Sequence, residues 1–225
     1  MFSDRHPDYD KYKALKGGIY TIEGIIGVGK TTMGRSLEKY INEIGLKARF
    51  YPEYVNRRLL GQYISDMKKY AYSFQLIMLF KRIEIYREAE KFASKGGIAF
   101  IDRSIIGDMT FARMQCDNGN FTEDEWKIYL STMEQEIQLR PTASIYLQCT
   151  CETSLKRILN RGIEAEIKGY SEEYINQLAQ SYDKSMEECK NVKHIIIDWN
   201  GAVKIENNIL CKEIINMILS KLLDV

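Results

Sequence analysis

The stretch from Ile19 to Thr32 constrains the fold more than any other part of the chain. It begins with a short apolar, β-branched run, continues through the glycine-rich segment Gly24–Gly29, and ends in residues with the apolar spacing of a helix. Strand, loop and helix therefore follow one another, and four residues separate the first glycine from Gly-Lys-Thr. Backbone N–H groups of such a loop can surround phosphate oxygens at a helix N-terminus, where the helix dipole also favours an anion. We expect a phosphate-binding loop rather than a glycine-rich turn that binds nothing.

Nucleotide and metal contacts are expected around this loop. Lys30 would place a positive charge at the β- and γ-phosphates, and the Thr31 hydroxyl would bind Mg²⁺. Asp102 directly follows the apolar run Gly97–Ile101, an arrangement suited to holding Mg²⁺ directly or through water, and Arg103 beside it can reach a phosphate. The expected nucleotide-binding residues are Gly24, Gly27, Gly29, Lys30, Thr31 and Thr32.

Strands alternate with helices along the chain, which predicts an α/β protein. The expected strands are Ile19–Ile22, Lys47–Pro52, Gly97–Ile101, Ala143–Cys149 and His194–Trp199. The expected helices are Lys30–Ile44, Arg57–Met67, Tyr72–Ser94, Ile105–Met114, Glu123–Leu139, Cys151–Asn160, one capped by Ser171 and running to about Cys189, and Val203–Leu223, with a loop at Glu164–Gly169. This alternation predicts the fold of P-loop kinases, a five-stranded parallel sheet with helices on both faces. Without repeats or linkers, residues 1–225 are expected to form a single domain.

Composition excludes several classes of function. The 32 basic and 31 acidic residues nearly balance, so nothing in the net charge of +1 favours nucleic acid or an anionic membrane as a partner. With two histidines in the chain, a histidine base or a multi-histidine metal site is not expected. The N-terminal sixteen residues lack an apolar signal region, and no run reaches the roughly 18 apolar residues of a membrane span. We expect a soluble, cytoplasmic protein with free thiols at Cys116, Cys149, Cys151, Cys189 and Cys211.

The motifs along the chain resemble, in their order, those of the deoxynucleoside kinase family. The resemblance covers about residues 17–182. It implies transfer of the γ-phosphate of ATP, or of another nucleoside triphosphate, to the 5′-hydroxyl of a deoxynucleoside with Mg²⁺. It also implies a lid at about residues 157–170 and a homodimer formed through helices. The helix at Thr122–Leu139 could serve for the homodimer or could simply be part of the core. The matching motifs are Gly24–Thr32, Pro52-Glu53, Tyr72-Ser73-Phe74-Gln75, Asp102-Arg103-Ser104, Arg140-Pro141 before Ile145-Tyr146-Leu147, and Arg157–Glu166.

The resemblance assigns the phosphoryl-transfer roles. Glu53 corresponds to the general base that takes the proton of the 5′-hydroxyl, whereas Glu23, the competing carboxylate, is expected to be structural. Arg103 would hold the 5′-hydroxyl or the transferred phosphoryl group. Arg157 and Arg161 would clamp the triphosphate by bidentate contacts.

The chain departs from the family pattern at several positions. Asp102 stands where the family has glutamate, which shortens the reach of the carboxylate toward Mg²⁺. Ile163 replaces a third lid arginine, and Arg58 replaces a tryptophan in the wall of the nucleoside site. The lid and that wall are therefore the parts of the site least defined by the resemblance.

The nucleoside contacts are also implied by the resemblance. The Gln75 amide offers one donor and one acceptor to the edge of a base, and Phe111 matches the aromatic residue that stacks on it. Tyr63, after a one-residue shift, and Glu166 match the pair that holds the 3′-hydroxyl. Taken alone, each of these aromatic residues is more typical of core packing than of a nucleoside site.

Base preference is expected to depend on Arg82 and Asp108. This charged pair matches the deoxycytidine and deoxyguanosine kinases, whereas thymidine-phosphorylating members have apolar residues there. An aspartate can accept from an exocyclic amine but opposes the thymine carbonyl, so we expect deoxycytidine and deoxypurines as substrates. A surface ion pair is the alternative, and Met78 would narrow the pocket.

Two other functions share much of this pattern. A thymidine or thymidylate kinase would have the same fold and an Asp-Arg pair after the strand, although the segment Tyr72–Gln75 argues against a monophosphate acceptor. A nucleotide-binding subunit without phosphotransfer would retain the loop alone. Both alternatives remain open from the residues.

Overall fold

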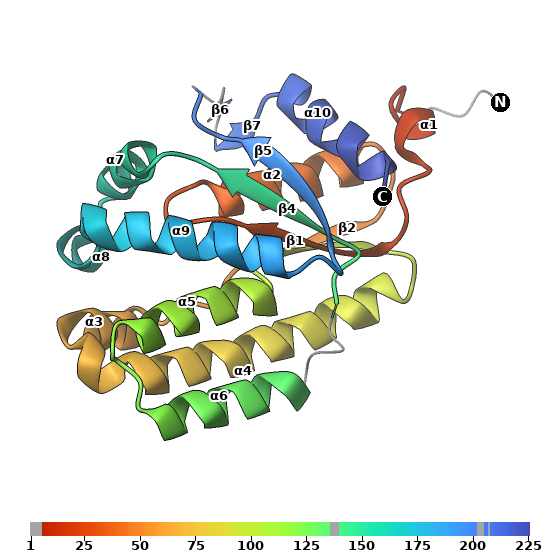
Figure 1. The fold of residues 1–225 in the computed structure, drawn as a ribbon. Coiled ribbons are helices and arrows are strands. Elements are labelled where there is room, and N and C mark those ends of the chain that lie inside the picture. Colours follow the sequence, from red (N-terminus) through yellow and green to blue (C-terminus); the bar gives the residue numbers. More distant parts are fainter. Residues whose placement is uncertain (1–5, 136–139, 202–204, 207) are drawn as a thin grey trace.

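Strand β1 (Gly18–Glu23) lies at the centre of a five-stranded parallel sheet, as Figure 1 shows. The structure is a computed structural model that describes residues 6–135, 140–201, 205–206 and 208–225. The other strands are β2 (Ala48–Tyr51), β3 (Ile98–Asp102), β4 (Ala143–Gln148) and β5 (Lys193–Asp198), and the sheet order is β2-β3-β1-β4-β5. Both ends of every strand lie within one residue of the predicted ends. The five-stranded parallel sheet confirms the predicted α/β P-loop kinase fold.

The register of the sheet brings the expected site segments to one edge. Ile22 lies opposite Asp102 in β3, and Tyr51 lies opposite Ile101. Because the strands are parallel, the loop after β1 and the segments after β2 and β3 leave the sheet side by side. Glu53, two residues beyond β2, therefore lies near the end of β3.

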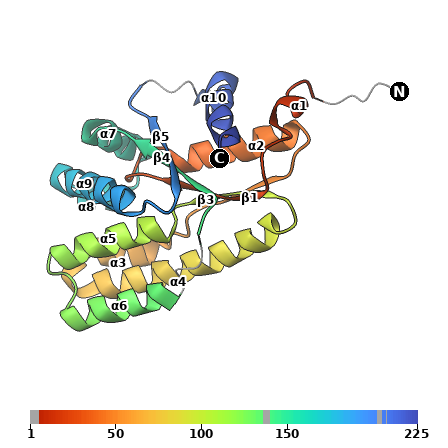
Figure 2. The ribbon, with the colours of Figure 1, turned by 45° about the vertical axis from the view of Figure 1, so that its right-hand side comes forward.

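Helices cover both faces of the sheet. Figures 1 and 2 show α2 (Lys30–Glu43) and α10 (Lys212–Leu223) on one side, with α4 (Met67–Ala93), α5 (Ile105–Asp117) and α6 (Glu123–Gln135) on the other. Helix α9 (Glu172–Glu188) packs against both α5 and α7 (Cys151–Arg161). The remaining elements are α1 (Tyr9–Tyr12), α3 (Arg57–Ser65), α8 (Glu164–Gly169) and the hairpin of β6 (Ile205–Glu206) and β7 (Ile209–Leu210).

Side-chain caps determine where several helices begin. Ser171 accepts from the N–H of Tyr174 at the start of α9, as predicted. Thr122 and Glu125 form the predicted capping box, in which each side chain accepts from the other residue's backbone N–H. The helix expected at Glu123–Leu139 is described to Gln135, and residues 136–139 lie outside the described part of the chain.

Three expectations about helices were wrong. The Asp66 carboxylate accepts from the N–H of Lys69, so α4 begins at Met67 rather than at the expected Tyr72. Helix α3 ends at Ser65, just before this cap. The expected loop at Glu164–Gly169 is the short helix α8, because Gly162 at φ +71° ends α7 and permits an immediate restart.

The helix expected at Val203–Leu223 begins only at Lys212. Before it, β6 and β7 form a hairpin whose turn contains Asn208 at φ +63°, a conformation that asparagine tolerates well. The N–H of Leu210 donates to the Ser36 hydroxyl at 2.9 Å, so the hairpin is fixed to α2. Residues 202–204, at the start of the expected helix, are outside the described part.

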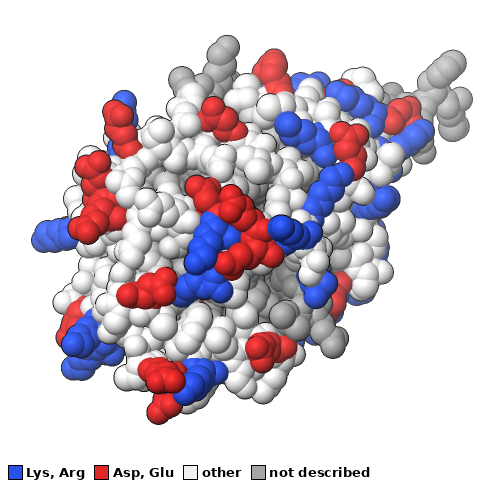
Figure 3. Space-filling model, in the orientation of Figure 1, with Lys and Arg blue, Asp and Glu red and all other residues white. Residues whose placement is uncertain are grey.

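The face of the molecule seen in Figure 1 carries mixed charge. Figure 3 shows acidic and basic side chains interspersed over the face seen in Figure 1. Among the described residues, no helix has both the length and the apolar character needed to cross a bilayer.

Packing between α2 and the sheet depends on the absence of a side chain at Gly34. A Cβ atom there would lie 2.1 Å from the nearest ring atom of Phe50, a buried residue of β2. Gly61 in α3 has open space around the same position, with nothing within 4 Å. Both glycines lie in helices, but a side chain would meet a neighbour only at Gly34, so Gly61 serves as the control position.

We expect Gly34→Ala to lower the free energy of unfolding by about 1–3 kcal/mol, because the new methyl group overlaps the Phe50 ring in a filled core. Gly61→Ala should raise it by up to about 1 kcal/mol, since alanine favours the helix and meets no neighbour. Urea unfolding of both variants measures the difference, and equal effects would contradict the packing described here.

Candidate active site

A cavity of about 970 Å³ lies at the carboxyl ends of the strands. It extends from the loop between β1 and α2 to aromatic residues of α3 and α4. Gly24 and Asp108 are the predicted site residues that do not line it. Those that do are Gly27, Gly29, Lys30, Thr31, Thr32, Glu53, Tyr63, Gln75, Arg82, Asp102, Arg103, Phe111, Arg157, Arg161 and Glu166.

The loop between β1 and α2 has the geometry expected for a phosphate site. Gly24, Gly27 and Gly29 all have positive φ, and a Cβ at Gly24 would lie 2.5 Å from the carbonyl oxygen of Leu147. Lys30 bends back over the loop, where its ammonium group donates to the carbonyls of Gly24 and Ile25. Burial and the neighbouring Arg103 lower the pKa of Lys30 to about 8. A bound phosphate would supply the negative charge that favours the ammonium form.

Thr31 and Asp102 meet where a cation is expected. The Thr31 hydroxyl donates to Asp102 Oδ2 at 2.9 Å, and Asp102 Oδ1 is buried without a hydrogen-bond partner among the described residues. Burial raises the pKa of the Asp102 carboxyl. A hard cation prefers oxygen ligands such as these, so the pair fits Mg²⁺ that is otherwise held by phosphate oxygens and water.

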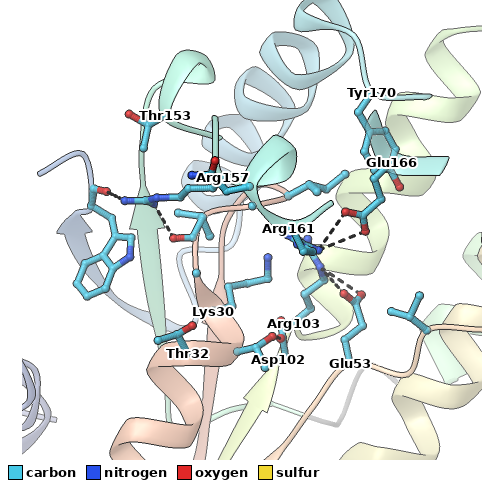
Figure 4. Close-up of a pocket in the computed structure, with 18 of the residues that line it drawn as sticks. Lys30, Thr32, Glu53, Asp102, Arg103, Thr153, Arg157, Arg161, Glu166 and Tyr170 are labelled. Carbon is cyan, nitrogen blue, oxygen red and sulfur yellow. Dashed lines mark hydrogen bonds and ion pairs between the residues drawn. The ribbon is translucent and has the colours of Figure 1, made fainter. Parts of the chain in front are cut away.

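The Glu53 carboxylate lies between two guanidinium groups, as Figure 4 shows for Arg103. It accepts from Arg82 Nη2 at 3.1 Å and from Arg103 Nε at 3.2 Å. Burial alone would raise the pKa of Glu53, but Arg103, Arg82 and Lys30 outweigh it and lower this pKa to about 2. Glu53 is therefore ionised at neutral pH and can accept a hydrogen bond from a hydroxyl group.

Arg103 has an unusual backbone conformation. Its φ is +69°, which a bulky residue rarely adopts and which occurs mostly where the surroundings enforce it. Its guanidinium donates to the carbonyl of Gly24 at 2.8 Å and to the hydroxyl of Tyr182. The side chain therefore connects the phosphate-binding loop to Glu53.

Asp108 lies behind the cavity wall, contrary to the direct base contact expected of it. Its Oδ1 accepts from Arg82 Nε at 3.0 Å and its Oδ2 accepts from the Tyr129 hydroxyl at 2.6 Å. The carboxylate is fully buried, and both of its oxygens have protein partners. Arg82, which does line the cavity, is therefore the member of the pair that can face a ligand.

Aromatic residues form the far end of the cavity. Tyr63 stacks on Phe74 with ring centroids 4.6 Å apart, and its hydroxyl lies 3.1 Å from that of Tyr174. Gln75 is buried, and its amide donates to the backbone carbonyl of Asp108 at 3.4 Å. The predicted residues Tyr63, Gln75 and Phe111 thus all line the same cavity, together with Met78.

The expected lid arginines have protein partners in this structure. Arg157 donates to the carbonyls of Val28 and Trp199, which joins α7 to the phosphate-binding loop. Arg161 pairs with Glu166 of α8 at 3.2 Å, as Figure 4 shows. Arg161 is the more exposed partner, with 43% of its side chain accessible against 8% for Glu166. Both arginines face the same cavity as Lys30.

Several residues at the site were not predicted. Tyr129 and Tyr182 contact Asp108 and Arg103 from helices distant in the sequence. Tyr170 and Trp199 also line the cavity. Their aromatic character and helical or strand spacing are equally typical of core residues, so no sequence signal separates them from the core.

Comparison with known proteins identifies the family of this chain. The deoxynucleoside kinase family profile matches residues 20–223. Deoxyadenosine kinase from Dictyostelium discoideum is 28% identical over 194 residues, which cover 85% of this chain and 76% of that protein. Deoxyadenosine/deoxycytidine kinase from Bacillus subtilis (strain 168) is 29% identical over 203 residues, with coverage of 85% and 90%.

Solved structures show the same fold. Deoxyadenosine kinase from M. mycoides with bound dATP has a TM-score of 0.74 at 24% identity, covering 91% of this chain and 98% of that chain. The same enzyme with dCMP and dCDP has a TM-score of 0.73 at 22% identity, covering 92% and 100%. With the family match over most of its length, the chain belongs to the deoxynucleoside kinase family, and it is an ATP-dependent phosphotransferase acting on deoxynucleosides.

Proposed function

We propose that this kinase phosphorylates the 5′-hydroxyl of deoxycytidine and deoxypurine nucleosides for nucleotide salvage, with Glu53 as the general base. The observation that carries the proposal is the position of Glu53, between two cationic side chains and where the phosphate-binding and aromatic ends of one cavity meet. A nucleoside lying against the aromatic end would direct its 5′-hydroxyl toward this carboxylate. Glu53 accepts the hydroxyl proton as the oxygen attacks the γ-phosphate.

The cationic residues stabilise the charge that develops on the transferred group. Arg103 holds the 5′-oxygen or the phosphoryl group, and Lys30 binds the β- and γ-phosphates. Arg157 and Arg161 exchange their protein partners for phosphate oxygens, so residues 157–170 act as a lid. Thr31 and Asp102 would hold Mg²⁺, which neutralises phosphate charge when bound.

Base selection depends on the ion pair of Arg82 and Asp108, which forms a charged wall behind the base. Gln75 pairs with the base edge, Phe111 stacks on it, and Tyr63 and Glu166 hold the 3′-hydroxyl. Arg82, oriented by Asp108, offers hydrogen-bond donors, whereas the thymine methyl group would desolvate the guanidinium without replacing a hydrogen bond. The names of the relatives in D. discoideum and B. subtilis support adenine and cytosine, whose unprotonated ring nitrogens can accept from Arg82 where thymine carries an N–H group.

Assembly and location are part of the same proposal. Residues 1–225 form a single domain, and two chains form a homodimer through helices such as α6. Five free cysteines suit a reducing compartment and support a cytoplasmic location.

A panel assay tests the acceptor class. With Mg²⁺ and ATP, we expect the purified protein to phosphorylate deoxycytidine, deoxyadenosine and deoxyguanosine with a larger kcat/KM than thymidine. Product formation is followed for these four and for thymidine monophosphate. Thymidine as the sole acceptor would overturn the base preference, and turnover of thymidine monophosphate alone would indicate a thymidylate kinase.

A double variant tests the charged wall. Arg82→Met with Asp108→Ala removes the ion pair as a unit, because removal of one partner would leave a buried unpaired charge. We expect the ratio of kcat/KM for thymidine over deoxycytidine to rise about tenfold, since the thymine methyl group would then meet an apolar wall. The variant also loses the contact from Arg82 to Glu53, which lowers kcat/KM for both nucleosides. The ratio of the two kcat/KM values therefore tests the base preference. An unchanged ratio would contradict the assignment.

A further inference from the structure

The left-handed backbone of Arg103 requires surroundings that hold it. Such a conformation is unfavourable in a residue other than glycine and persists where neighbours over-determine it. The chain turns here from β3 into α5, and the N–H of Arg103 donates to the carbonyl of Ile22 at 3.0 Å. That bond alone fixes the peptide before Arg103 but not the peptide after it.

The Glu23 side chain fixes the peptide after Arg103. Its Oε1 accepts from the backbone N–H of Ser104 at 2.5 Å, and the residue is fully buried at the end of β1. Gly107 makes room for this carboxylate, because a Cβ there would lie 2.4 Å from Glu23 Oε2 and 2.8 Å from the Tyr182 hydroxyl. The end of β1, the turn into α5 and helix α9 therefore meet around one glycine.

The Tyr182 hydroxyl directs the Arg103 guanidinium. It accepts from Arg103 Nη1, and its ring is fully buried, stacked on Tyr146 at a centroid distance of 6.0 Å. The same ring meets Phe111 edge-on at 6.1 Å, and the Arg103 guanidinium carbon lies 4.7 Å from the Phe111 centroid. Arg103 Nη1 is therefore held by Tyr182 and the carbonyl of Gly24, while its Nε donates to Glu53. The guanidinium can rotate little between these contacts.

We propose that Tyr182 and Glu23 are positioning residues that hold Arg103 beside Glu53 and the phosphate-binding loop, and this proposal rests on the role proposed above for Arg103. Glu23 sets the backbone of Arg103, and Tyr182 sets the direction of its side chain. Neither needs to contact the substrate, because both act through Arg103. Through Phe111, Tyr182 also links the phosphoryl-transfer end of the site to the base-stacking end.

Tyr182→Phe tests the side-chain part against a matched control. Tyr86→Phe removes the hydroxyl of another buried tyrosine, one that has no hydrogen-bond partner among the described residues. We expect Tyr182→Phe to lower kcat about tenfold, with KM for the deoxynucleoside within about twofold, because a hydrogen bond to a charged group is lost. Tyr86→Phe should leave both constants unchanged. A kcat for Tyr182→Phe equal to that of the control would overturn this part of the proposal.

Glu23 is tested by two replacements. Glu23→Gln retains an oxygen that can accept from the Ser104 N–H, so it should retain most of the kcat, whereas Glu23→Ala should lose about tenfold. Thermal unfolding of each variant shows whether the protein is folded at the assay temperature. A residue that only stabilises the fold would lower the unfolding midpoint and leave the kcat of the folded protein unchanged. That result for Glu23→Ala would contradict the proposal, even if Tyr182→Phe failed to fold.

Arg103→Lys separates failure of this proposal from failure of the proposed function. If the positioning residues act through Arg103, Tyr182→Phe should have little further effect on kcat in the Arg103→Lys background. Full activity of Arg103→Lys would overturn the role of Arg103 itself. Low activity of Arg103→Lys, together with additive effects of Tyr182→Phe, would overturn only the positioning role.

Discussion

The charge balance at Glu53 holds the active site together. A single buried charge is unfavourable, but here one carboxylate accepts from two guanidinium groups, and Arg82 is paired again by Asp108. The partners follow β2, lie in α4 and follow β3, so they meet only because β2 pairs with β3 and α4 packs on β3. The order of the strands therefore brings these charged residues together. Glu53, Arg82, Arg103 and Asp108 in turn connect the nucleoside end of the cavity to the phosphate end.

The parts predicted correctly from the sequence are those with local signals. The five strands are short apolar runs bounded by glycine or polar residues, and the strand–loop–helix arrangement of β1 and α2 follows from the glycine-rich segment between two apolar patterns. The capping residues Thr122 and Ser171 were equally visible, because a cap is a contact within one turn. The loop after β1, Glu53 and Arg103 meet at one cavity because they follow parallel strands, whose carboxyl ends share one edge. Helices α3, α4 and α5 bring the predicted nucleoside contacts to the same cavity.

The parts not predicted depend on tertiary contacts. A Ser36 hydroxyl of α2 fixes the hairpin of β6 and β7 where periodicity indicated a helix. The start of α4 is an exception, because the Asp66 cap is a local contact that the sequence analysis missed. Burial of Asp108 behind Arg82 depends on Tyr129 from α6, and the direction of Arg103 depends on Tyr182 from α9. A buried tyrosine has the same sequence pattern whether it fills the core or holds a charged group.

The most direct test of the central claim is the behaviour of Glu53→Gln. The amide keeps the size of the side chain but accepts no proton at neutral pH, so phosphoryl transfer in a single turnover with saturating ATP and Mg²⁺ should fall about 10²–10⁴-fold. Calorimetric titration should show deoxycytidine still binding with a Kd within a few-fold of the wild-type value, because the aromatic end of the cavity is unchanged. An unchanged rate of phosphoryl transfer would contradict the assignment of Glu53 as the base and the account of the site built on it.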